Sequence, residues 1–206
     1  MKRLGGPVRL LGCALLVAAL GACGTDGGQN ATKGQSKKEQ KVSAMDMQQA
    51  GQRSEAILDG TLAAIRPPVK WVYGAPAEAA CSTGLNEPTG STTVTRSRNI
   101  LTVVSEHRRG NLLGVVQRYW ERQGFRVVSV NSDKDMPWIR AKGPDGLTVS
   151  MEVGSIGNVS LSAGLSCAEN SAMTYPTGTP GRPGGPKAEE LRPREQSAFW
   201  SSRESR

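Results

Sequence analysis

The chain has 206 residues, a formal net charge of +8 at pH 7 and an aromatic content of only 4%. Glycine and proline are denser at the two ends than in residues 44–170, which hold the apolar patterning that a folded core requires. Length and composition therefore exclude several large domains and predict one small domain between two tails.

Residues 1–22 have the three parts of an export signal, which are a basic start, an apolar stretch from Leu10 to Leu20, and two small residues. Eleven apolar residues at about 1.5 Å each cover roughly half of a hydrocarbon layer of about 30 Å, which argues against a spanning helix. We therefore expect this segment to be removed. It carries Lys2, Arg3 and Arg9 and no acid, so its loss lowers the net charge from +8 to +5.

The end of this segment, Leu20-Gly21-Ala22-Cys23, resembles the bacterial lipobox, in which a peptidase cuts before a cysteine that becomes lipid-modified. The resemblance implies that Cys23 becomes the first residue, with a diacylglyceryl thioether and usually a further acyl chain, such as palmitate, on its amine. Two chains hold a protein stably at a membrane, whereas one holds it only marginally. This predicts an anchor at the extracytoplasmic face of the cell membrane. The alternative is an ordinary secretory signal with an unrelated cysteine.

Two tails are expected around the domain. Residues 23–43, which follow the signal, contain one aliphatic side chain larger than that of alanine, Val42, and no aromatic one, so they predict a flexible tether after the lipidated cysteine. Residues 171–206 begin with a Pro/Gly-rich stretch and continue with charged residues, which predicts disorder. Phe199 and Trp200 stand out in this tail, either by chance or as an exposed docking handle.

Between the tails, residues 44–170 alternate helical and extended patterns. The apolar spacing of residues 44–65 predicts an amphipathic helix that begins near Ser43 and Asp46 and ends before Pro67. A second helix is expected over residues 111–123, with Gly124 at its end. Strands are predicted at residues 69–74, 91–105, 125–131, 138–142, 147–153 and 159–167, with residues 91–105 forming either one long strand or two short ones. This order predicts an α+β domain with one antiparallel sheet and both helices on the same face.

The four cysteines can all be assigned if the chain is exported. Cys13 leaves with the signal and Cys23 carries the anchor, so Cys81 and Cys167 remain as an even pair in an oxidising compartment, which predicts a disulfide. Closing so long a loop contributes about 4 to 5 kcal/mol in the chain-entropy model. A redox or metal pair is the weaker alternative, because the sequence has no C-x-x-C motif and only one histidine, His107. Cys167 is in phase with the apolar residues of the last strand, so we expect it to face the interior.

The signal, lipobox, tether, amphipathic helix, tryptophan strand before Cys81, "ERQGF" helix end and final cysteine together resemble the actinobacterial LppA-like lipoproteins. The resemblance covers most of residues 45–169 and rests on architecture and cysteine placement. It implies a surface-exposed lipoprotein without an established activity, and it supplies no catalytic residue.

No catalytic residue, cofactor or metal site is predicted. A Ser-His-Asp hydrolase would need His107 as its base and Ser166 as its nucleophile, but Ser166 is expected within a strand rather than on a sharp turn. The carboxylates have no spacing that selects a glycosidase pair, and phosphate-loop, dinucleotide and penicillin-binding motifs are absent from the sequence. An enzyme is therefore not expected.

Several partners are considered for an exported basic domain. Nucleic acid is not expected, because the arginines lack interleaved aromatic side chains. An envelope protein or an anionic wall polymer is a possible partner. Four arginines are expected to lie on a scattered, solvated surface, with a patch for wall polymer or lipid headgroups as the alternative; they are Arg96, Arg98, Arg108 and Arg109.

The sequence thus predicts a lipid-anchored, non-enzymatic binding or scaffolding module at the cell envelope. The alternative is a carrier of a small hydrophobic ligand, such as a lipid or a cell-wall precursor, and an envelope hydrolase ranks below both. A carrier would need a cavity under the sheet lined by Trp71, Leu113, Val149 and Leu161, whereas a binding module would have a filled core there.

Overall fold

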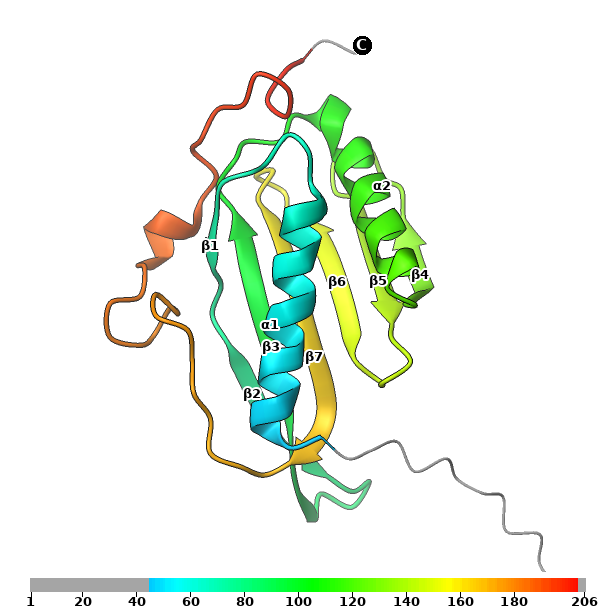
Figure 1. Ribbon diagram of the computed structural model, residues 1–206, viewed down its shortest axis with the longest axis vertical. Coiled ribbons are helices and arrows are strands. Elements are labelled where there is room, and N and C mark those ends of the chain that lie inside the picture. The colour runs from blue at the N-terminus through cyan, green and yellow to red at the C-terminus, as the bar shows by residue number, and fades with distance from the viewer. Residues whose placement is uncertain (1–44, 204–206) are drawn as a thin grey trace, which may run out of the picture. The chain divides into compact units, whose positions relative to one another are not determined.

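The structure, a computed structural model, describes residues 45–203 and is shown in Figure 1. It contains two α-helices, α1 (Met47–Ala64) and α2 (Glu106–Arg122), and a short 3₁₀ helix, η1 (Ala188–Leu191). Its seven strands are β1 (Trp71–Tyr73), β2 (Ala77–Ser82), β3 (Pro88–Ile100), β4 (Arg126–Asn131), β5 (Trp138–Lys142), β6 (Thr148–Val153) and β7 (Val159–Glu169). The predicted α+β domain with one antiparallel sheet is confirmed.

All seven strands belong to one sheet in which every pair is antiparallel. The strand order is β1-β3-β7-β6-β5-β4, and β2 also pairs with β3, beyond the end of β1. The long strand β3 therefore has β7 on one side and β1 followed by β2 on the other. This places β1 and β2 along one edge of the sheet and β4 at the opposite edge.

Both helices cover the same face of the sheet, α1 over β3 and β7 and α2 over the β4–β6 half (Figure 1). The alternation of apolar and polar side chains in β5, β6 and β7 directs the apolar side chains toward the helices. The main core lies between the layers, and its largest fully buried apolar side chains include Leu58, Leu112, Trp120, Ile139, Met151 and Leu161. A second, smaller cluster of Met47, Ala50, Val94 and Ala168 lies under the start of α1.

Local signals in the sequence set the helix ends. Asp46 caps α1, because its carboxylate accepts a hydrogen bond from the backbone of Gln49 while the Gln49 side chain bonds back to Asp46. Gly124 lies just after the end of α2 and has a φ of +82°, which glycine adopts without strain, and Phe125 N–H then bonds to the carbonyl of Trp120. The end of α2 was predicted. The cap of α1 is Asp46 rather than Ser43, which lies outside the described residues, and α2 begins at Glu106, five residues before the predicted start.

The turns between the late strands are also those that the sequence predicts. Gly146 N–H bonds to the Gly143 carbonyl at 3.1 Å between β5 and β6, and Gly157 N–H bonds to the Gly154 carbonyl at 2.9 Å between β6 and β7. The sequence did not predict β2, because its alanines lack the apolar alternation of a half-buried strand. It forms through pairing with β3 at an exposed edge.

Candidate functional site

Residues 171–203 form a strap that runs along the folded domain, so the predicted disorder of this segment is wrong. The strap starts beside the first turn of α1, passes the outer side of β1, forms η1 and returns to the start of α2 (Figure 1). Two aromatic side chains anchor it, Tyr175 and Trp200. Each anchor is an aromatic side chain that packs on the domain. The Pro/Gly-rich and charged composition of this segment did not indicate that packing.

Trp200 is the deeper anchor. Its side chain is 1% exposed and belongs to the main core, and its indole N–H bonds to the carbonyl of Pro67 at 2.6 Å. Phe199 packs edge-on against Trp200, and its ring lies 4.3 Å from the guanidinium carbon of Arg108. The aromatic pair is therefore part of the fold and not an exposed docking handle.

Tyr175 anchors the other end of the strap. The guanidinium carbons of Arg96 and Arg182 lie 4.6 and 3.9 Å from its ring centre, and its hydroxyl bonds to the carboxylate of Glu78. Burial raises the pKa of the Tyr175 phenol, and the hydrogen bond to Glu78 raises it further. Next to it, the side chain of Gln48 and residue Thr174 exchange two hydrogen bonds of 2.8 Å.

Beneath this end of the strap lies a group of charged side chains that we call the arginine cluster, formed by Arg96, Arg98, Glu55, Asp59 and Glu78. Its two arginines are 3% and 1% exposed. Both share the helix-facing side of β3 with Val94 and Ile100, because every second residue of a strand faces the same way. They therefore point at α1 rather than at solvent.

Glu55 is the centre of the arginine cluster. Its two carboxylate oxygens contact Arg98 and, at 3.4 Å, Arg96, and Asp59 bonds to Arg98 at 2.8 Å. Glu78 lies 3.8 Å from Arg96. Two cations thus face three carboxylates, so the cluster attracts neither sign of charge strongly. Nη2 of Arg96 is buried without a hydrogen-bond partner in the described part of the chain.

The aromatic side chains of β1 cover the other side of Arg98. Its guanidinium carbon lies 4.4 Å from the ring centre of Tyr73 and 5.1 Å from that of Trp71, and the two rings meet edge to face at 5.4 Å. Both side chains are half-buried, and Trp71 also packs against the core. Arg98 therefore links α1, β3 and β1 in one contact.

The expected solvated surface of four arginines is wrong for three of them. Arg96 and Arg98 are buried under α1, and Arg108 is 5% exposed beside the strap. Arg109 is partly exposed and bonds to the backbone of Asp135. The sequence did contain an indication of this burial. Arg96 and Arg98 alternate in step with Val94 and Ile100, so in a strand all four side chains face the same side.

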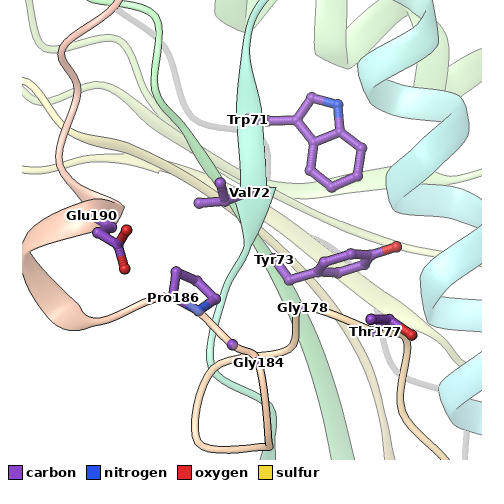
Figure 2. A pocket seen from close by; sticks show the side chains of 9 residues that line it. Trp71, Val72, Tyr73, Thr177, Gly178, Gly184, Pro186 and Glu190 are labelled. Atoms are coloured by element: carbon purple, nitrogen blue, oxygen red, sulfur yellow. The ribbon is translucent and has the colours of Figure 1, made fainter.

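A groove lies between β1 and the middle of the strap, with a volume of about 610 Å³ and a wide opening to solvent. Figure 2 shows Val72 pointing toward Pro186 and Glu190, while Trp71 and Tyr73 point the other way, toward α1. The lining consists of Trp71, Val72, Tyr73, Thr177, Gly178, Gly184, Gly185, Pro186 and Glu190. We call this space the β1 groove.

A smaller hollow of about 340 Å³ lies on the other side of Tyr175, above Arg96, between the first turns of α1 and the strap. Gln48, Gln52 and Thr174 contribute polar atoms to it. Sequence reasoning did not find either hollow, since both need the strap as one wall.

Cys81 and Cys167 form the predicted disulfide, with their Cα atoms 5.7 Å apart. The bond joins β2 and β7, which lie on either side of β3, and it passes close to the Thr93 hydroxyl. Strands two places apart are roughly 9.6 Å apart in a regular sheet. Irregular register in both pairs, between Ala80 and Ser82 and between Thr92 and Val94, accompanies the closer approach.

The predicted inward orientation of Cys167 is wrong. One extra residue in β7 opposite β3 shifts the alternation, so that Ala168 is 2% exposed and Cys167 lies on the surface. Cys167 has a φ of +56°, the left-handed conformation of a bulged residue. An alternating pattern alone gives no sign of such an insertion.

Several predicted features lie outside the described residues, namely the export signal, the tether, and the lipobox of Leu20, Gly21, Ala22 and Cys23. Within residues 45–203, no helix combines the length and apolar character needed to cross a bilayer. No group of three or more His, Cys, Asp or Glu side chains suited to a metal ion occurs there either.

The two residues considered for a hydrolase are not brought together. His107 is exposed in the first turn of α2, beside a recess that also contains Ser105 and Arg203. Ser166 lies near the C-terminal end of β7, next to Cys167. The geometry thus offers no Ser-His contact between them.

Comparisons with known proteins give a weak structural likeness. No protein-family description matches the sequence, and no curated protein matches it. Among solved structures, the chain is similar to the crystal structure of a DUF4853 family protein from Actinomyces odontolyticus, with 15% sequence identity and a TM-score of 0.40. The match covers 70% of this chain and 80% of that chain. The resemblance to LppA-like lipoproteins stays a prediction.

Proposed function

We propose that this protein is a binding or scaffolding module, anchored by lipid on Cys23 at the extracytoplasmic face of the cell membrane and without enzymatic activity. The N-terminal sequence supports the anchor, through its short apolar stretch and the residues before Cys23. The disulfide between Cys81 and Cys167 supports export to an oxidising compartment.

The proposed binding role rests on the position of two recesses in the surface. The β1 groove and the hollow above Arg96 are both open to solvent at the surface, and each has a wall made by the strap. Such recesses admit a partner without any opening of the fold.

The carrier alternative has less support. It requires a cavity between the helices and the sheet, but Leu113, Val149 and Leu161 belong to one continuous buried cluster. Side chains at these positions are 8%, 1% and 0% exposed. A ligand held there would have to displace packed side chains, which is unfavourable in a core that is already close-packed.

The arginine cluster favours a protein over an anionic polymer as the partner. Arg96 and Arg98, which a linear view of the sequence assigns to a basic patch, are matched internally by Glu55, Asp59 and Glu78. They are therefore not available to neutralise a polyanion.

The test compares cells that carry the wild-type chain, Cys23→Ala or the matched control Cys13→Ala. Because Cys13 lies in the segment expected to be cleaved, its substitution should leave the protein in the membrane fraction, as in wild type. Cys23→Ala should move it to the soluble fraction. Chemical cross-linking of intact cells, followed by mass spectrometry, should recover the same envelope partners from wild type and Cys13→Ala and lose them with Cys23→Ala.

The opposite pattern would overturn the proposal. If the Cys23→Ala protein stays in the membrane with every partner, the anchor is not at that residue. If the mature protein starts at Met1, the export signal is wrong as well.

A further inference from the structure

The strand β1 has backbone groups that its neighbour β3 does not use. Gly74 N–H bonds to the Ser97 carbonyl at 2.9 Å, Leu101 N–H bonds to the Lys70 carbonyl at 2.8 Å, and Val72 lies opposite Asn99 in the same register. Backbone groups of successive residues point to opposite sides of a strand. Those of Trp71 and Tyr73 therefore point away from β3.

These free groups border the β1 groove. Figure 1 shows β1 between β3 and the middle of the strap, and the groove is lined by Trp71, Val72 and Tyr73 on the strand side. No hydrogen bond described for residues 45–203 pairs the strap with the backbone of Trp71 or Tyr73. The edge thus offers two donors and two acceptors to whatever occupies the groove.

The strap is fixed at both ends of the groove rather than left loose beside β1. At one end, Tyr175 is fixed by Glu78 and Arg96. At the other, the N–H groups of Arg194 and Glu195 bond to the Leu101 carbonyl at 2.7 and 2.9 Å. Between these attachments the strap forms the far wall of the groove, so that wall is held in place by contacts at both of its ends.

We propose that the β1 groove binds an extended segment of a partner polypeptide, which adds to β1 as a new edge strand. This deepens the proposed function and rests on it, because it names the chemical class of the partner. Trp71 and Tyr73 exchange hydrogen bonds with the backbone of the segment, and Val72 contacts one of its side chains. Because β1 has three residues, such pairing covers about three residues of the segment, with the flanking residues reaching the walls of the groove.

The lining sets the charge of that segment. Glu190 is the only charged residue in the lining of the β1 groove. Its carboxylate also accepts a hydrogen bond from Lys187 N–H, which fixes it at the start of η1. We infer that the segment carries a basic side chain toward η1 and an apolar one toward Val72.

The opposite sheet edge supplies a matched control. Strand β4 also ends the sheet, but an irregularity in its pairing with β5 between Val127 and Ser129 interrupts its backbone pattern. Such bulges protect an edge from further pairing. Val128 is 53% exposed there, so a charge at this position should not disturb the fold.

Amide hydrogen exchange tests the edge without any ligand. In the full-chain Cys23→Ala protein, we expect the amides of Val72 and Gly74 to exchange slowly and those of Trp71 and Tyr73 to exchange quickly. If Trp71 and Tyr73 are as strongly protected as Val72, their groups already have partners and the proposal fails.

The second step selects ligands from phage-displayed random peptides of about ten residues, with the same full-chain protein immobilised. Titration calorimetry then measures the selected peptides against wild-type side chains, Val72→Glu, Glu190→Lys and Val128→Glu. We expect each groove variant to weaken binding at least about tenfold and Val128→Glu to leave it unchanged. Circular dichroism checks folding, and Glu190→Lys gives an independent answer if Val72→Glu unfolds.

Three results would overturn the proposal. They are the selection of no peptide, binding that both groove variants retain, and binding without new protection of the Trp71 and Tyr73 amides. None of these bears on the anchor, which the Cys23→Ala and Cys13→Ala cells decide separately. The experiments can therefore show that the β1 groove binds no peptide while the proposed membrane anchor still holds, or the reverse.

Discussion

The two helices cover the same sheet face, but the side chains that they bury differ in kind. Beneath α2, the buried side chains are mainly apolar, as with Leu112, Val116 and Trp120. Beneath α1, apolar side chains fill only part of the interface, and the rest is the arginine cluster around Glu55.

The two interfaces therefore contribute differently: one mainly stabilises the fold, and the other mainly fixes the position of β1. Apolar contacts under α2 are non-directional and contribute in proportion to the buried area. The arginine cluster depends on particular geometry, because Glu55 must reach both arginines and Arg98 must lie against Trp71 and Tyr73. We infer that the α2 side mainly holds the fold together, while the α1 side mainly sets where β1, and with it the β1 groove, lies.

The largest effect is expected on the apolar side. Trp120 is fully buried, and its indole N–H bonds to Thr61 at 2.9 Å. Trp120→Ala should lower the free energy of unfolding by about 3 to 5 kcal/mol, because it opens a large cavity and leaves a polar contact unmade. Urea denaturation measures this, with the exposed-site variant Val128→Ala as control. A loss below about 1.5 kcal/mol would mean that the α2 interface repacks freely.

The next effect concerns the strap. Trp200→Ala removes its deeper anchor and should cost about 3 kcal/mol, the low end for a buried tryptophan, because the strap can detach locally instead of leaving a closed cavity. Limited proteolysis should then cut between residues 176 and 198 much faster than in wild type. Equal rates of cleavage would show that the strap does not depend on this anchor.

A moderate effect is expected in the arginine cluster. Glu55→Gln removes the charge shared by Arg96 and Arg98, and we expect a loss of about 2 kcal/mol in the free energy of unfolding. The exposed pair of Arg140 and Glu152 provides the control, since Glu152→Gln should cost less than about 0.5 kcal/mol. Similar losses in the two variants would remove the distinction between buried and surface pairs here.

The smallest effect depends on pH. Burial, and then the hydrogen bond to Glu78, raise the pKa of Tyr175 above its ordinary value of 10.0. The neutral phenol thus contributes stability that is fully present below that value and is lost as the pH rises through the pKa of the folded protein. Wild type should therefore lose stability relative to Tyr175→Phe above pH 10.0. Urea denaturation of both proteins on either side of this pH measures the difference, and a constant gap would contradict the prediction.

Much of the fold was determined by the sequence itself. Asp46, Gly124 and the turn at residues 143–146 each set a helix end or a reversal through local hydrogen bonds and allowed backbone angles. The alternation in residues 147–153 and 159–165 assigned one sheet face to the core. The pairing of Cys81 with Cys167 followed from counting the cysteines that remain if the chain is exported as the sequence predicts.

The tertiary structure alone decided the features that form the candidate site. An extra residue in β7 turned Cys167 outward, although the local pattern directed it inward. Arg96 and Arg98 became buried because α1, distant in sequence, supplies Glu55 and Asp59. Trp200 gave order to a tail of disordered composition because a site beside Pro67 receives its ring. In each case the deciding free energy comes from a partner far along the chain, and a composition or a periodicity reports only what neighbouring residues can do.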